Sequence, residues 1–188
     1  MKTTFVTSLA LSSLFLMGCE TNIANLRSGA QADEAPFGGP ESVDYAAALW
    51  QQMVEDDLVG DDAILSTPYT GTHPHGAILD TIEGKTTVRG HTGDVIIKRN
   101  YGGEGVSKQA VANNPDQYLM AVTVMFRREA GYDPENQDWY WVKYAPDGSV
   151  IPEQGMKPAG RVDMCIGCHA TAPGQDLVFN HDRFPPLK

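Results

Sequence analysis

The feature that most constrains this chain is a stretch near its C-terminal end, Cys165-Ile166-Gly167-Cys168-His169. Cys-x-x-Cys-His is the attachment signature of a c-type haem, in which two thioethers hold the porphyrin and the imidazole binds the iron. In a helix Cys165 and His169 lie four residues apart on one face. The motif therefore predicts a short helix that holds the ring edge and the metal together.

Two other sites use cysteines at this spacing. A zinc site needs two more Cys or His ligands at a recognisable spacing, and the remaining cysteine, Cys19, is near the other end of the chain. A thioredoxin-like dithiol sits at the start of a βαβ unit, which the surrounding sequence does not resemble. We therefore interpret Cys165, Cys168 and His169 as the attachment residues of a covalent haem c.

The N-terminal residues read as an export signal. Lys2 precedes an apolar run at residues 5–17, which is shorter than the roughly 20 residues of a membrane span. The run ends Leu16-Met17-Gly18-Cys19, which resembles the lipobox of bacterial lipoproteins. The resemblance implies a signal peptide at residues 1–18, an acylated Cys19 and a lipid-anchored protein facing the periplasm. The alternative is an ordinary secretory signal with an unrelated cysteine.

The rest of the chain divides into a tether at residues 19–41 and one domain at residues 42–188. The three cysteines are then used, one for lipid and two for haem, which leaves none for a disulfide. The formal net charge of −10 becomes −11 once Lys2 is removed. An acidic surface disfavours nucleic acid and anionic lipid, so we expect membrane contact only through the N-terminal lipid. It suits a cationic redox partner protein, or is simply solvated.

Hydrophobic periodicity predicts a helix at residues 42–55, capped by Ser42 or Asp44, with a core-facing stripe at Tyr45, Leu49 and Met53. A short helix is predicted at residues 107–114. Strands are predicted at residues 77–82, 93–100, 118–127 and 139–144. Short connections between them favour a mostly β (α+β) fold, an antiparallel sheet with a few helices and a C-terminal helix that holds haem c.

The nineteen residues after His169 contain no methionine. In ordinary electron-transfer cytochromes c a downstream methionine supplies the second axial ligand. Its absence predicts either an open distal position, which binds NO, CO or hydroxylamine, or a sixth ligand from upstream. His75 is the obvious upstream residue to test, whereas His73 reads as an exposed turn residue.

Most of the domain, residues 42–180, resembles the cytochrome P-460 family, which includes the β-sheet cytochromes c′-beta. The resemblance implies an antiparallel sheet, a covalent haem c and often a homodimer. The segments that carry it are Pro74-His75-Gly76, Val95-Ile96-Ile97-Lys98, Gly131-Tyr132-Asp133, Asp138-Trp139-Tyr140-Trp141-Val142-Lys143-Tyr144, Asp147-Gly148, Gly160-Arg161, Met164-Cys165-Ile166-Gly167-Cys168-His169 and Asp176-Leu177-Val178-Phe179.

The family's enzymes oxidise hydroxylamine with a haem cross-linked to a lysine and with a distal carboxylate. The resemblance places Lys98 at the lysine's position, although such a residue alone reads as a surface lysine. The carboxylate's position falls on Arg127, and Glu129 shares its face if the strand runs that far. Arg127 cannot accept a proton at neutral pH but can hydrogen-bond a bound anion or NO.

The sequence thus predicts a c-type haem protein that binds or oxidises a small nitrogen species, hydroxylamine or NO, at an open distal site. The alternatives are an electron-transfer monohaem cytochrome c and a non-catalytic NO- or CO-binding protein. Candidate catalytic residues are Lys98, Arg127 and Glu129, and His75 is a candidate for the distal pocket.

Overall fold

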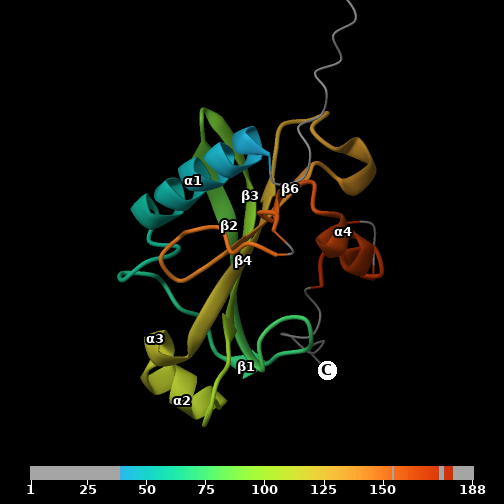
Figure 1. The fold of residues 1–188 in the computed structure, drawn as a ribbon. Coiled ribbons are helices and arrows are strands. Elements are labelled where there is room, and N and C mark those ends of the chain that lie inside the picture. The colour runs from blue at the N-terminus through green and yellow to red at the C-terminus, as the bar shows by residue number, and fades with distance from the viewer. Residues whose placement is uncertain (1–38, 154, 174–175, 180–188) are drawn as a thin grey trace, which may run out of the picture. The chain divides into compact units, whose positions relative to one another are not determined.

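The computed structural model describes residues 39–153, 155–173 and 176–179, all within one compact unit of residues 35–188. Its centre is a six-stranded antiparallel sheet in which strands adjacent in sequence are also adjacent in space (Figure 1). This confirms the predicted mostly β fold. The strands are β1 (Tyr69–Thr70), β2 (Ile78–Val88), β3 (His91–Tyr101), β4 (Leu119–Arg127), β5 (Trp139–Tyr144) and β6 (Ala159–Gly160).

Within the described residues the α-helices are α1 (Pro40–Glu55), α2 (Lys108–Asn113), α3 (Pro115–Tyr118) and α4 (Asp163–His169), and a 3₁₀ turn spans Pro134–Asn136. Ser107 caps α2 by accepting a hydrogen bond from the Ala110 N–H at 3.1 Å. Tyr118, predicted as the first residue of a strand, instead ends α3. Among the described residues, no helix has the length and apolar character needed to cross a membrane.

β2 and β3 form a longer hairpin than the predicted strands at residues 77–82 and 93–100. They pair without interruption from Ile78↔Tyr101 to Val88↔His91. The loop residues Arg89 and Gly90 have φ of 51° and 84°, as a tight two-residue hairpin turn requires. Gly93 lies within β3, where only a glycine fits because a Cβ would lie 2.0 Å from the Arg127 carbonyl oxygen.

Helix α1 begins at Pro40, two residues before the predicted start. Its N-cap is Gly39, and neither Ser42 nor Asp44 caps it, so that prediction is wrong. Proline at the first helical position has the φ that a helix needs and lacks only an N–H that would be unpaired there. The predicted apolar stripe is confirmed, since Tyr45, Leu49 and Met53 are buried against the sheet.

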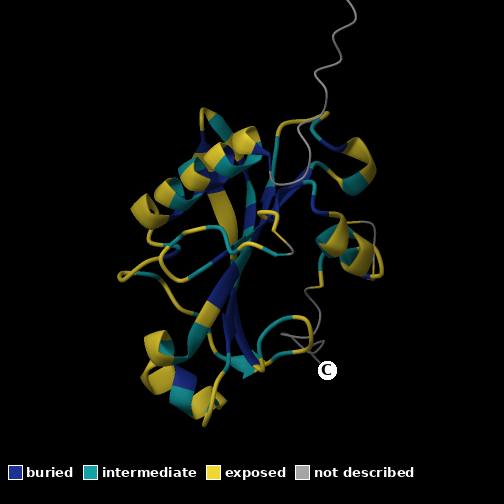
Figure 2. Cartoon of the chain, in the orientation of Figure 1, coloured by how far each residue is buried: buried dark blue, intermediate teal, exposed yellow. Residues whose placement is uncertain are grey.

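Side chains alternate between the two faces of the sheet, and the two faces carry different clusters. Val95 and Ile97 of β3 pack with α1 in the main core. On the other face, α4 packs on a second cluster built from Met125, Trp139, Trp141 and Val162. Figures 1 and 2 show α1 and α4 on opposite sides of the sheet, whose central strands are largely buried. We call the side covered by α4 the α4 face.

Candidate haem site

The Cys-x-x-Cys-His residues form helix α4, as the sequence predicts. Cys165 is half-buried against the Trp141 cluster, Cys168 is exposed, and both are free thiols. Burial, followed by the negative charge of Glu153, raises the pKa of the Cys165 thiol to about 11. The thiol is therefore protonated at neutral pH and would supply the hydrogen that a haem vinyl group takes up in thioether formation.

His169 is oriented by the segment that follows α4. Its Nδ1 lies 2.7 Å from the Leu177 carbonyl oxygen, and because a carbonyl only accepts, Nδ1 donates. The lone pair of the neutral ring is therefore on Nε2, as in metal-binding histidines whose other nitrogen is held by the protein. Burial lowers the pKa of His169, and the positive charge of Lys98 lowers it further, whereas the hydrogen bond to Leu177 raises it. The ring packs against Trp141 and Phe179, with centroids 4.7 and 5.4 Å away.

His75 faces His169 from the turn between β1 and β2. The ring centroids are 6.3 Å apart and the ring planes cross at 86°. His75 Nδ1 lies 2.9 Å from Oδ1 of Asn100. Burial, followed by the charge of Lys98, lowers the pKa of His75 to about 4, so the ring is neutral at neutral pH.

Lys98 stands on the α4 face beside these rings. The strand register places it opposite Thr81 of β2 and Thr123 of β4, and Thr123 opposite Lys143 of β5. Lys98 is half-buried, and its charge acts on both histidines. Lys143 forms an ion pair with Glu153.

The neighbouring Arg99 belongs to the opposite face. It is buried and forms an ion pair with Asp80 at 2.8 Å. It also donates to the carbonyl oxygen of Leu58 at 2.6 Å. The structure thus separates the two adjacent cations, and only Lys98 lies near the two histidines.

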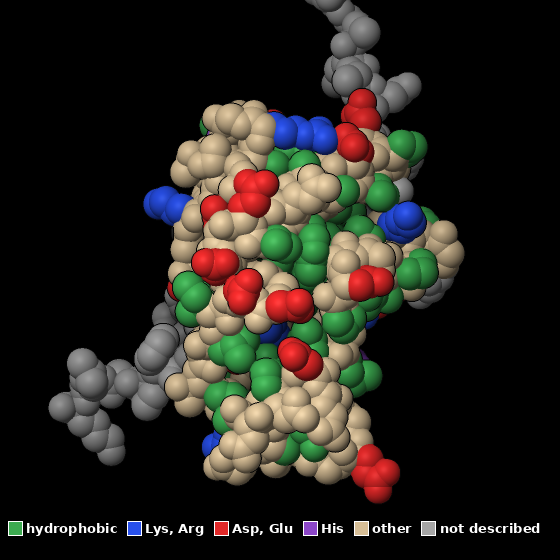
Figure 3. Space-filling view, turned by 90° about the vertical axis from the view of Figure 1, so that its left-hand side faces the viewer, with side chains coloured by type: hydrophobic (Ala, Val, Ile, Leu, Met, Phe, Trp, Pro, Cys, Tyr) green, Lys and Arg blue, Asp and Glu red, His purple; other side chains and the backbone are tan. Residues whose placement is uncertain are grey.

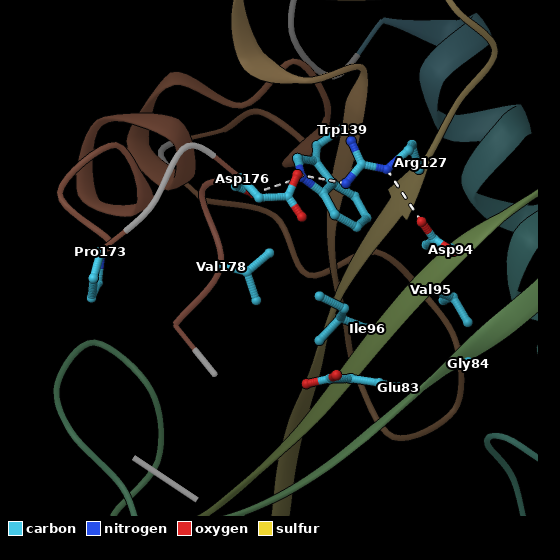
Figure 4. Close-up of a pocket in the computed structure, with 10 residues that line it drawn as sticks. All are labelled: Glu83, Gly84, Asp94, Val95, Ile96, Arg127, Trp139, Pro173, Asp176 and Val178. Carbon is cyan, nitrogen blue, oxygen red and sulfur yellow. Dashed lines mark hydrogen bonds and ion pairs between the residues drawn. The ribbon is translucent and has the colours of Figure 1, made fainter. Parts of the chain in front are cut away.

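Arg127 lies on the α4 face but away from the histidines. Its guanidinium stacks 4.0 Å from the centre of the Trp139 ring and pairs with Asp176 at 2.6 Å and Asp94 at 3.4 Å (Figure 4). Asp94 is four residues along β3 from Lys98, a distance of about 13 Å at 3.3 Å per residue. A cavity of about 270 Å³ lies here, lined by Arg127, Asp94, Asp176 and Trp139 together with Ile96 and Val178.

Glu129 does not share this face, because β4 ends at Arg127. Its carboxylate instead accepts two hydrogen bonds from Arg128, at 2.7 and 2.8 Å, which lower its pKa. Arg128 in turn stacks 3.9 Å from the ring centre of Tyr45 in α1. The expectation that Glu129 stands beside Arg127 is therefore wrong.

Several residues of this site were missed by the sequence analysis. Asn100 could have been found, because it is two residues beyond Lys98 on the same strand face. Thr123 depends on the pairing of β3 with β4, and the Leu177 contact uses a backbone carbonyl, so neither has a sequence signal. Trp141 was noted only as part of a segment that resembles the family, and its buried indole Nε1 has no hydrogen-bond partner among the described residues.

The residues present fit a haem. Two free thiols and an imidazole with an available Nε2 lie on one helix, over an apolar cluster that contains an unpartnered indole N–H donor. A zinc site fits less well, because the described part of the chain holds no group of three or more His, Cys, Asp or Glu that could bind a metal ion. The predicted lipidation site, Cys19, lies outside the described residues.

Comparison with known proteins supports the interpretation of these residues as a haem site. The family model described as Cytochrome P460 matches residues 58–180, well over half of the chain, and spans all six strands and α4. No curated protein and no solved structure matched the chain. The family implies a haem cofactor. The chain therefore belongs to the cytochrome P460 family, as a c-type haem protein of that family.

Proposed function

We propose that the protein binds or oxidises a small nitrogen species, NO or hydroxylamine, at a haem held covalently by Cys165 and Cys168 and bound at the iron by His169. The observation that carries the proposal is that the neutral imidazoles of His75 and His169 face each other on the α4 face of the sheet. The bound haem would supply a one-electron redox centre and a coordination position for the ligand. The remaining steps belong to the protein's side chains.

On the His75 side, polar groups surround the position where a ligand would be bound. Lys98, which carries an ammonium group, and Thr123, which carries a hydroxyl, stand opposite each other in the sheet register. Both can donate to a bound nitrogen or oxygen atom. The family resemblance implies a covalent link from Lys98 to the porphyrin, which would take the place of the free ammonium. Arg127 is less suited to this role, since two carboxylates and Trp139 already engage its guanidinium.

Export and lipid anchoring through Cys19 are part of the proposal, and they place the haem outside the cytoplasm. Acidic side chains outnumber basic ones on the face seen in Figure 3, in keeping with the net charge of −10. Such a surface would favour a cationic electron acceptor. A homodimer is implied by the family resemblance alone.

Two measurements test this function. Haem-stained denaturing gels should show covalent haem in protein made by cells competent in cytochrome c maturation, and Cys165→Ala with Cys168→Ala should abolish it. The ferrous protein should then bind NO and CO. Electron transfer is the second candidate, because two facing imidazoles also suit a six-coordinate iron. A ferrous spectrum unchanged by saturating CO would select electron transfer over the proposed function.

A further inference from the structure

We infer that His75 binds the haem iron through Nε2 in the resting protein, opposite His169, and that an incoming small ligand displaces it. The inference rests on the proposed haem site and adds a regulatory step to it. In the exchange one iron–nitrogen bond breaks and one bond to the ligand forms, with no change in the number of electrons.

The first support is the fixed orientation of the His75 ring. The Asn100 amide nitrogen donates to the carbonyl oxygens of Lys98 at 2.8 Å and Ala121 at 3.2 Å. Its Oδ1 therefore faces the other way, where it accepts the Gly76 N–H at 3.3 Å. An oxygen in this position can only accept from His75 Nδ1, so Nδ1 carries the hydrogen and Nε2 carries the lone pair.

The second support is that His75 and His169 match. Each ring donates from Nδ1 to a protein oxygen, Asn100 Oδ1 in one case and the Leu177 carbonyl in the other. Both nitrogens available for a metal are therefore Nε2. A histidine that only donated a hydrogen bond to a bound ligand would need the opposite tautomer, with its hydrogen on Nε2.

The third support is the distance between the rings. An imidazole nitrogen binds a metal ion at about 2 Å, and the ring centre lies roughly 1 Å behind that nitrogen, so two imidazoles on opposite sides of one ion have centroids about 6 Å apart. The observed separation is 6.3 Å. Ring planes that cross at 86° are compatible with such an axis, because each plane can contain it.

The position of His75 also explains how the bond can be broken. The backbone beside it is fixed, since Gly76 packs so closely on β3 that a Cβ would lie 2.5 Å from the Tyr101 carbonyl oxygen. The imidazole itself is held by Asn100 and by a longer contact of 3.4 Å to Thr123. Displacement therefore requires rotation of one side chain, with no opening of the sheet.

The test compares the wild-type holoprotein with His75→Ala and with His73→Ala, an exposed histidine of the same turn. We expect a low-spin six-coordinate ferric spectrum for the wild type and for His73→Ala, and a high-spin spectrum for His75→Ala. Added imidazole should restore the low-spin spectrum of His75→Ala. The CO-binding rate should level off with CO concentration in the wild type, but rise linearly in His75→Ala and exceed the wild-type rate by roughly tenfold or more.

Wild-type protein with covalent haem and a high-spin ferric spectrum would overturn this inference alone, and that result needs no variant to fold. A His75→Ala protein that stays low-spin would also overturn it and would assign the sixth ligand elsewhere, with the buried Met125 of the same face as the residue to substitute next. Absence of covalent haem from the wild type would overturn the proposed function, and this inference with it.

Discussion

Arg127 is predicted to act on the proximal side of the haem, through the segment that orients His169. Its guanidinium pairs with Asp176 at 2.6 Å, and the Trp139 indole N–H donates to the Asp176 carbonyl oxygen at 3.0 Å. Leu177, the next residue, supplies the carbonyl that fixes His169 Nδ1. Removing the ion pair should therefore loosen the Leu177 hydrogen bond.

The magnitudes follow from exposure and contacts. The Arg127 and Asp176 side chains are 27% and 58% exposed, so Asp176→Asn should cost about 0.2–1 kcal/mol of unfolding free energy. Arg127→Gln also loses the stacking on Trp139, which contributes about 0.5–1 kcal/mol more. Both changes fall within the range that chemical denaturation of the holoprotein can resolve, and neither should prevent folding.

The specific readout is the iron–histidine bond. A weaker Nδ1 hydrogen bond makes His169 a poorer donor to the iron, because such partners raise the basicity of the ligand. We expect Asp176→Asn and Arg127→Gln to lower the ferrous iron–His169 stretching frequency in resonance Raman spectra and to raise the reduction potential. The spectra should be recorded in the His75→Ala background, where the iron is expected to be five-coordinate.

Asp94→Asn is the matched control, since it removes the other carboxylate on Arg127 without touching the 176–179 segment. It should leave the stretching frequency unchanged. If Arg127→Gln alters the NO dissociation rate while Asp176→Asn leaves the iron–histidine frequency unchanged, Arg127 acts on the distal side and the proximal assignment is wrong.

Three further predictions test other parts of the molecule. Lys98→Ala should move a red-shifted Soret band to the position of an ordinary haem c, and peptide mapping of the unchanged protein should find Lys98 joined to the haem peptide; no cross-linked peptide and an unchanged spectrum would refute the link. Asp80→Ala should destabilise the fold by about 3–5 kcal/mol in urea unfolding, because it leaves the buried Arg99 unpaired. The haem spectrum should not change, since this pair lies on the other face. Cys19→Ser should release the exported protein from membranes, and a wild type that is already soluble would contradict the lipid anchor.

The sequence carried enough information to predict the fold class and α4 because both depend on local patterns. Antiparallel strands joined by short connections can form only a few sheet topologies. The Cys-x-x-Cys-His motif predicts a helix, because a helix places its first cysteine and its histidine on one face. The alternation of side chains along a strand also places the neighbours Lys98 and Arg99 on opposite faces of β3. Alternation alone does not say which of the two faces α4, because both faces of the strand carry a basic residue at this end. The structure decides this through Val95 and Ile97, which share the Arg99 face and pack with α1.

The rest of the site depends on contacts between segments distant in sequence. The Lys98–Thr123 pairing joins strands separated by the α2–α3 connection, and no residue type in that connection fixes the register. The orientation of His169 depends on a main-chain carbonyl, which every residue carries. The interpretation of Glu129 was wrong because β4 ends at Arg127, and beyond that point the Glu129 carboxylate bonds to its neighbour Arg128.

The sequence position that holds the distal carboxylate in the family's enzymes therefore has a different role in this chain. Along the sequence that position falls on Arg127, which suggests a cation where the family's enzymes have a proton acceptor. In space Arg127 holds the segment behind His169, and Glu129 lies toward α1. Three carboxylates line the cavity: Asp94 and Asp176, which pair with Arg127, and Glu83, which stands opposite Ile96 on β2. Because Arg127 holds the segment that follows α4, its presence at this sequence position does not by itself argue against hydroxylamine oxidation.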